Sequence, residues 1–395
     1  MKKIKFLVIP FLVLVIFALG SNCYINNQLK KLSGKDLSSI ESKYGYGPKD
    51  KGIYIKANLT DSKNIVFLGS SELNVPVEQN PVSFFPISDF RYNPSIFGSA
   101  NVQSLQHSSI LSSKTSYNDD DKQVFVVSMQ WFFLNNGIDN QNFQAKFAPT
   151  QFYNFFSNPS ISEENKKYYA GRVAGLLTNS SDFRAEELYA RLYSQDNILK
   201  KAAFNLFKPY YFIRSQVLVL NDKVKVLREL SKLPDKKSET TYREINWQSE
   251  YKKAEEQGAA AVTNNEFGVN DKYYDLYLKD KISSIKNVSE NVDLQKSLEF
   301  KDYEFFLSVC KDLGAKPYIV IMPTNGKYYD YIGVSKAKRD SFYNRVEAMA
   351  KEKGFSVLNL KDKEYEPYYM NDVMHLGWKG WLNIDEQVYK YFKDK

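Results

Sequence analysis

Two neighbouring serines lie in the tetrapeptide Gly69-Ser70-Ser71-Glu72, directly after the short apolar run 64–68. A buried strand that runs into such a turn exposes a hydroxyl at the carboxyl end of a parallel sheet, where α/β proteins bind ligands. If a helix follows, its first N–H groups can stabilise an oxyanion, so either serine is a candidate nucleophile. The alternative is structural, with Ser70 or Ser71 capping the helix and Glu72 in its first turn.

A second group of chemically useful residues lies near the end of the chain. Asp372 and His375 stand three residues apart in the segment 371–378, which follows the last apolar run. At this spacing a carboxylate can orient an imidazole, whose other nitrogen can accept a proton from a serine. The chain has two histidines, and His107 lies in a helical pattern with no acid nearby in sequence. His375 is therefore the predicted base and Asp372 its orienting acid.

Two further groups could stabilise an oxyanion between these ends. The segment 95–101 is expected to open a helix and can present the N–H group of Gly98. Gln130 follows the apolar run 123–127 and could donate its side-chain amide, although it could also be satisfied locally. Trp131 and Phe132, the next two residues, are expected to be ordinary core residues.

The elements that would position these residues follow an α/β pattern. Four short, nearly continuous apolar runs (64–68, 123–127, 317–322 and 355–360) are typical of parallel strands buried on both faces. Stretches with helical apolar spacing lie at 101–113, 297–313, 337–353 and 377–393. The alternation predicts an open α/β sheet with flanking helices. Residues 150–296 are expected to form a large helical insertion, within which 211–220 is ambiguous between helix and strand.

The composition excludes several classes of protein. The 395 residues include 43% hydrophobic and 15% aromatic residues, which is a globular composition rather than a disordered one. Two cysteines cannot build a disulfide framework or a CxxC zinc site, and two histidines cannot build a histidine-rich metal centre. We therefore expect no cofactor and no metal. The net charge is +8, and residues 196–245 carry 11 Lys/Arg against 6 Asp/Glu. This local excess is either a solvated helix face or a platform for a polyanion or lipid headgroups.

The N-terminus predicts export from the cytoplasm. Residues 1–5 read MKKIK and an apolar run follows from 6 to 20, as in a signal peptide or an N-terminal transmembrane helix. Cleavage after Ala18-Leu19-Gly20 is one alternative, and a lipoprotein at Cys23 is disfavoured because Asn22 precedes it. Both main readings place residues 26–395 outside the cytoplasm. We expect an anchor at 1–25, a membrane-proximal linker at 26–63 with one short strand near 52–56, and a catalytic domain at 64–395.

The motifs together resemble a known superfamily and, more closely, one family within its pattern. A Gly-x-Ser, a later Gly, a polar amide and a closing Asp-x-x-His are similar to the SGNH (GDSL) hydrolase pattern, although the GDSL string itself is absent. The stretches FLGSSEL, FGSANVQSLQH, SMQWF and DVMHLGWKGW resemble the DltD family, membrane-anchored proteins required for D-alanylation of teichoic acids in Gram-positive bacteria. The resemblance implies an SGNH-hydrolase-like, flavodoxin-like parallel sheet. It assigns Ser71 as nucleophile, Asp372 and His375 as its partners, and Ser71, Gly98 and Gln130 as the oxyanion hole, where Gln130 replaces the usual Asn.

The expected function is that of an extracytoplasmic serine esterase or acyltransferase in lipoteichoic acid D-alanylation, either transferring D-alanyl groups or hydrolysing a D-alanyl ester or thioester. The resemblance implies three partners: lipoteichoic acid as polyanionic acceptor, a membrane-bound acyltransferase with other pathway proteins, and the cell membrane. No nucleic acid is expected. The alternative is a non-catalytic scaffold that binds teichoic acid or a membrane acyltransferase.

Overall fold

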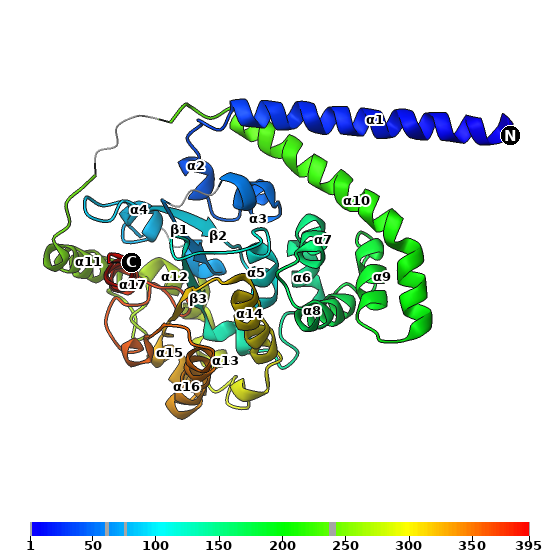
Figure 1. Cartoon of the computed structure of the whole chain (residues 1–395). Helices are drawn as coiled ribbons and strands as arrows, with labels where there is room; N and C mark the ends of the chain where they lie inside the picture. Colours follow the sequence, from blue (N-terminus) through cyan, green and yellow to red (C-terminus); the bar gives the residue numbers. More distant parts are fainter. Residues whose placement is uncertain (1, 60–62, 75–76, 237–241, 395) are drawn as a thin grey trace.

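The protein is built around a five-stranded parallel β-sheet (Figure 1). The computed structural model describes residues 2–59, 63–74, 77–236 and 242–394, without the side chains of 2–15 and 59. The strands are β1 (Asn64–Leu68), β2 (Asn93–Phe97), β3 (Lys122–Val127), β4 (Tyr318–Ile321) and β5 (Val357–Asn359), in the order β2-β1-β3-β4-β5. This is the flavodoxin-like strand order, in which the ligand crevice opens between β1 and β3. The predicted α/β sheet with flanking helices is confirmed.

The sequence pattern found four of the five strands and missed β2. Residues 95–97 belong to this strand, so the prediction that the segment 95–101 opens a helix is wrong for its first residues. The run Asn93-Pro94-Ser95-Ile96-Phe97 carries a proline, which has no N–H to donate to a ladder and is tolerated mainly on edge strands. β2 pairs with β1 alone and is such an edge.

Helices cover both faces of the sheet because successive strand residues point to opposite sides. Val66 and Leu68 face a core shared with α5 (Ser104–Leu111), α14 (Glu299–Leu313) and α16 (Lys336–Glu352). Ile65 and Phe67 face a second core with α4 (Pro81–Phe84), α11 (Trp247–Ala261) and α17 (Trp378–Phe392).

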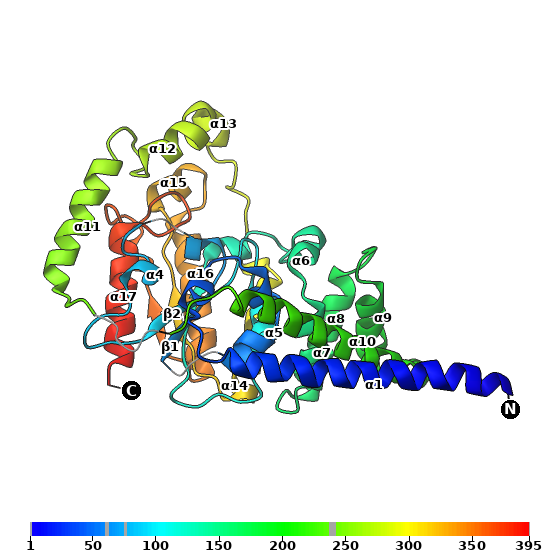
Figure 2. The ribbon, with the colours of Figure 1, turned by 90° about the horizontal axis from the view of Figure 1, so that it is seen from above.

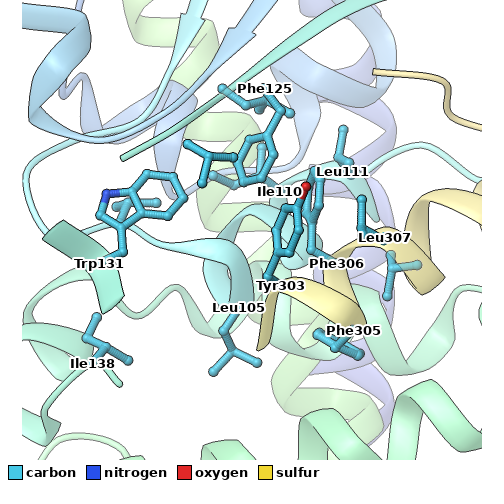
Figure 3. Close-up of a cluster of buried hydrophobic side chains, with 14 of the residues drawn as sticks. Leu105, Ile110, Leu111, Phe125, Trp131, Ile138, Tyr303, Phe305, Phe306 and Leu307 are labelled. Atoms are coloured by element: carbon cyan, nitrogen blue, oxygen red, sulfur yellow. The ribbon is translucent and has the colours of Figure 1, made fainter. Parts of the chain in front are cut away.

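Aromatic packing fills the first of these cores. Phe125 of β3 stacks on Phe306 of α14 with ring centroids 4.0 Å apart (Figure 3). Leu105 and Ile110 of α5 contribute to the same cluster, and all four side chains are buried. This packing fixes α5 and α14 against the strands that precede the candidate site.

The long segment between β3 and β4 is helical among its described residues. Five of its helices form a lobe beside the sheet (Figures 1 and 2): α6 (Asn140–Lys146), α7 (Pro149–Ser157), α8 (Glu163–Leu176), α9 (Arg184–Tyr193) and α10 (Ile198–Leu230). The ambiguous stretch 211–220 is part of α10. Beyond this lobe, α11 packs on α17 and so belongs to the sheet's second face, followed by the short helices α12 (Asp271–Tyr273) and α13 (Ile282–Ile285).

The N-terminal segment is more structured than the predicted linker. α1 (Lys2–Lys31) is followed by α2 (Ser38–Glu41), α3 (Gly47–Asp50) and a π-helical turn (Ile55–Leu59), which stands where a short strand was expected near 52–56. Lys49 is buried and donates to the backbone carbonyls of Glu41, Lys43 and Ile96, so this segment is bonded to β2.

The transmembrane prediction concerns the first part of α1. Within the residues searched, which are those that the structure describes, no helix combines enough length and apolar character to cross a membrane. The apolar run on which the prediction depends begins at residue 6, and the side chains up to residue 15 lie outside the described residues.

Candidate functional site

The turn after β1 separates the two candidate serines. Ser70 is buried and donates its hydroxyl to the carbonyl of Ser99 at 3.2 Å. Ser71 is more exposed and begins a 3₁₀-helix (Ser71–Asn74) rather than the α-helix that the sequence pattern suggested. The two side chains therefore leave the backbone in different directions, and the hydroxyl of Ser71 is the one that faces the closing segment of the chain.

The closing segment brings His375 and Asp372 to that hydroxyl. His375 Nε2 lies 3.0 Å from Ser71 Oγ, and His375 Nδ1 lies 2.8 Å from Asp372 Oδ2. Both distances are within hydrogen-bonding range, so the three side chains form a continuous chain from hydroxyl to carboxylate. This is the geometry in which an imidazole can take the serine proton while the carboxylate holds its tautomer.

Asp372 is fixed from its other side by the backbone of its own loop. Its Oδ1 atom accepts the N–H groups of Met374 and His375, both at 2.8 Å. One carboxylate oxygen thus shapes the loop and the other meets the imidazole. The loop is closed by the N–H of Asn371, which donates to the carbonyl of His375 at 2.9 Å. α17 then begins immediately after Gly377.

A buried carboxylate lies beneath the serine turn. Glu72 is 2% exposed, and its Oε1 accepts the Ser70 N–H at 2.5 Å. Burial raises the pKa of Glu72 to about 7, against the influence of the Ser70 N–H and the charge on His375. Burial disfavours the imidazolium, but the hydrogen bond to Asp372 and the negative charges of Asp372 and Glu72 outweigh it and raise the pKa of His375. The imidazolium that forms during proton transfer is therefore stabilised from two sides.

Gly98 packs tightly against the serine turn. A Cβ atom at Gly98 would lie 2.0 Å from the carbonyl oxygen of Gly69, so no larger residue fits without moving the backbone. The backbone N–H of Gly98 also acts on Asp50: burial raises the pKa of that carboxyl, while Lys49 and then the Gly98 N–H hold it back. The amide expected to serve an oxyanion therefore also has a carboxylate nearby.

Gln130 stands at the carboxyl end of β3, in the 3₁₀-helix Met129–Phe132. Its Nε2 donates to the hydroxyl of Tyr329 at 3.1 Å. Tyr329 lies on α15 (Gly326–Tyr331), and burial raises its pKa, with the charge of Asp372 adding to the rise. The side-chain amide of Gln130 thus has a local hydrogen-bond partner, as one alternative predicted. The bond to Tyr329 uses one of the two amide hydrogens.

His107 occupies a different environment from His375. It is fully buried on α5, with its ring 5.3 Å from Phe125 and 6.2 Å from Trp131. Burial lowers the pKa of His107 to about 3, so the side chain is neutral at physiological pH. It is a core residue behind the turn and is not in contact with Asp372.

Two nearby residues were not singled out as site residues from the sequence. Glu72 was read only as a first-turn carboxylate, and nothing in the run Lys327-Tyr328-Tyr329-Asp330 distinguishes Tyr329. Both become visible when the strands are aligned, because the ends of β1, β3, β4 and β5 meet at one edge of the sheet. Among the described residues, no group of three or more His, Cys, Asp or Glu side chains could hold a metal ion.

The fold and the site define a doubly wound α/β protein that carries a Ser–His–Asp arrangement at the carboxyl edge of its sheet. Comparison with known proteins places it more narrowly: residues 42–393 match the family model described as DltD protein, and the chain belongs to the DltD family. It is 31% identical over 348 residues to Protein DltD of Bacillus subtilis (strain 168), covering 87% of this chain and 86% of that one. Against Protein DltD of Staphylococcus aureus (strain NCTC 8325 / PS 47) the identity is 30% over 346 residues, covering 87% and 85%. Protein DltD of Lacticaseibacillus rhamnosus is 24% identical over 351 residues, covering 87% and 81%.

Proposed function

We propose that this protein is an SGNH-type serine acyl-transfer enzyme with Ser71 as nucleophile, His375 as base and Asp372 as orienting acid. The observation that carries the proposal is the unbroken chain of contacts from Ser71 Oγ through the imidazole to Asp372 Oδ2, at 3.0 and 2.8 Å. The burial of Asp372 and its two backbone hydrogen bonds add support, because an orienting carboxylate must itself be held still.

The first half-reaction forms an acyl-enzyme. His375 Nε2 takes the proton of Ser71 Oγ as the oxygen attacks the carbonyl carbon of an ester or thioester. The N–H groups of Ser71 and Gly98 and the free hydrogen of the Gln130 amide are the proposed donors to the oxyanion. The tetrahedral intermediate then collapses, the imidazolium protonates the leaving alcohol or thiol, and the acyl group remains on Ser71.

The second half-reaction returns the enzyme to its starting state. A hydroxyl of the acceptor, or water, gives its proton to His375 and attacks the acyl carbonyl. Collapse breaks the bond to Ser71 Oγ, which recovers its proton from the imidazolium. Transfer rather than hydrolysis requires the acceptor hydroxyl to be held close to the acyl group or water to be kept out.

The proposed acyl group is D-alanyl, and the proposed acceptor is a glycerol hydroxyl of lipoteichoic acid. This part of the proposal depends on the role of the DltD family in teichoic acid D-alanylation. On the same basis we propose a membrane-bound acyltransferase and other proteins of that pathway as partners. We also propose that residues 1–25 anchor the chain in the cell membrane with the catalytic part outside. N-terminal sequencing of the membrane-extracted protein tests the anchor, and a mature chain that begins at Ser21 would contradict it.

Serine replacement tests the chemistry directly. We expect Ser71→Ala to abolish hydrolysis of a small carboxylic ester by the purified protein and D-alanylation of teichoic acid in cells. Ser70→Ala is the matched control, because it removes a hydroxyl from the neighbouring residue. Among the described contacts, the Ser70 hydroxyl donates only to the Ser99 carbonyl. If Ser71→Ala keeps D-alanylation in cells, a non-catalytic scaffold becomes the better description.

A further inference from the structure

Helix α10 exposes an unusual amount of apolar surface. Nine of the nineteen large apolar side chains that the described residues expose lie on this one helix. They include Leu199 at 79%, Leu206 at 77% and Val217 at 61% exposure. Soluble monomers rarely leave contiguous apolar patches of this extent uncovered, so the surface indicates an interaction site.

Six of these nine exposed positions form one stripe along the helix. Each residue of an α-helix turns by about 100° and rises by about 1.5 Å, so positions whose angles coincide share a face. On an ideal helix the positions 199, 206, 210, 213, 217 and 224 fall within about 60° of one another and extend over about 37 Å, with Pro209 inside the helix between the second and the third of them. We call these six residues the α10 stripe: Leu199, Leu206, Tyr210, Ile213, Val217 and Val224.

The opposite side of α10 is packed against the protein and fixes its rotation. Tyr211 is buried against Tyr153 and Tyr189 of the helical lobe. Further along, Arg214 forms an ion pair with Glu186 at 2.6 Å. Asp222 is buried and accepts the N–H groups of residues 53 and 54 at 2.8 and 3.0 Å. Arg214 lies at the flank, whereas Tyr211 and Asp222 lie about 130–150° around the helix from the middle of the stripe, so the stripe faces outward.

Basic residues accompany the stripe. α10 carries seven Lys/Arg and two Asp/Glu. Part of this charge is already engaged: Lys201 pairs with Asp196 at 3.1 Å, and Lys223 donates to Asn22 at 2.9 Å. Two exposed basic residues lie on the stripe's side of the helix: Arg228 falls at the edge of its angular range and Lys225 about 60° beyond that edge. An apolar stripe with Arg228 and Lys225 at one border and a tyrosine within it is the pattern of helices that lie at the surface of an anionic bilayer.

Helix α1 meets the C-terminal end of α10 directly after the N-terminal apolar run. Asn22 meets Lys223, and Leu29 packs in one cluster with Leu230, so the two helices run in the same direction where they touch. α1 projects from the body, whereas α10 packs on α7 and α9, and the two helices diverge away from their contact (Figures 1 and 2). Phe17 and Leu19 of α1 are 75% and 64% exposed, which extends the apolar surface onto the second helix.

We propose that the α10 stripe docks into the headgroup–acyl boundary of an anionic phospholipid bilayer. The stripe enters the apolar edge of the leaflet while Arg228 and Lys225 remain among the phosphates. α1 and α10 then hold the body of the protein against the membrane at two separate elements. Two attachment points restrain the orientation of the sheet edge that carries Ser71 relative to the membrane surface. With a single helix as attachment, the body could rotate about that helix.

Site-specific labelling of the full chain tests the proposal. In a Cys23→Ser background, with Cys310 buried and unreactive, an environment-sensitive fluorophore is attached at Leu206→Cys or Val217→Cys. Asn205→Cys is the matched control, because it is exposed and lies about 100° away from Leu206 around the same helix. Each labelled protein is reconstituted into vesicles of phosphatidylcholine with phosphatidylglycerol that contain an acyl-chain nitroxide quencher. Circular dichroism and thermal unfolding, compared with the unlabelled protein, show that the variants are folded.

Docking predicts at least roughly threefold stronger nitroxide quenching at positions 206 and 217 than at 205, with the reverse order for aqueous iodide. Raising the salt concentration should weaken the difference in these vesicles. Equal quenching at all three positions would overturn the proposal. The proposal would also be overturned if iodide quenched the stripe positions in vesicles but not in native membranes. That result would indicate that the stripe binds a membrane protein rather than lipid.

Discussion

Replacing Asp372 by asparagine separates the charge of the proposed triad from its shape. The variant keeps the size of the side chain, and its amide oxygen can still accept the N–H groups of Met374 and His375, now bonded to Oδ1 at 2.8 Å each. That arrangement leaves an NH₂ group facing His375 Nδ1 across the present 2.8 Å contact. Because NH₂ is a donor, it favours the tautomer with hydrogen on Nε2, which cannot accept the proton of Ser71.

The expected loss in kcat is about 10⁴-fold, as for the same change in other serine triads. At about 1.36 kcal/mol per factor of ten, this corresponds to about 5.4 kcal/mol of transition-state stabilisation. KM should change little, because the carboxylate supports the base rather than the substrate. Removing the negative charge also lowers the pKa of His375, so any residual activity should extend to lower pH than in the wild type.

The assay is hydrolysis of a small ester over a range of pH, combined with thermal unfolding. Asp372→Ala is the companion variant: it also leaves the two loop N–H groups without their acceptor, which costs about 1–3 kcal/mol for each group that stays buried. The alanine variant should therefore melt at a lower temperature than the asparagine variant while both are similarly inactive. If Asp372→Asn retains more than a tenth of wild-type kcat, the proposed role of Asp372 is refuted.

Three further predictions concern the surroundings of the triad. Glu72→Gln should raise the melting temperature more at pH 8 than at pH 5: a carboxyl whose pKa rises from 4.5 to about 7 on folding loses stability as the pH rises through that window, by up to about 3 kcal/mol. Equal melting shifts at both pH values would contradict this reading. Gln130→Ala should lower kcat about 10²–10³-fold with KM little changed, whereas Tyr329→Phe, which removes only the acceptor of the Gln130 amide, should keep most activity. Steady-state kinetics of the two variants test this role, and a fully active Gln130→Ala variant would show that Gln130 is not an oxyanion donor. Gly98→Ala should lose both activity and stability, measured by ester hydrolysis and thermal melting, because its Cβ would lie 2.0 Å from the Gly69 carbonyl; a stable, active variant would contradict the packing.

Much of the sheet follows from local sequence pattern. Strands that are buried on both faces must be largely apolar, so the three inner strands β1, β3 and β4 are visible as short apolar runs. β2 and β5 are the two edges of the sheet: β5 was visible because it lies in the largely apolar run 355–360, whereas β2 escaped detection because Asn93, Pro94 and Ser95 interrupt its apolar pattern. The scarcity of histidine was equally informative, since it left His375 and His107 as the two possible bases.

What the sequence determined by itself was the set of groups able to react: a Gly-Ser-Ser turn after a strand, and an aspartate three residues before a histidine. The family resemblance indicated Ser71, but the contact between its hydroxyl and the imidazole exists only in the tertiary structure, because 304 residues separate Ser71 from His375 and the parallel strand order brings their loops to one edge. It also decided the state of Glu72 and the partner of Gln130, which depend on burial and on neighbours from other strands. Local pattern records what a residue can do next to its sequence neighbours, whereas solvent exclusion and long-range contacts arise only when the whole sheet is assembled.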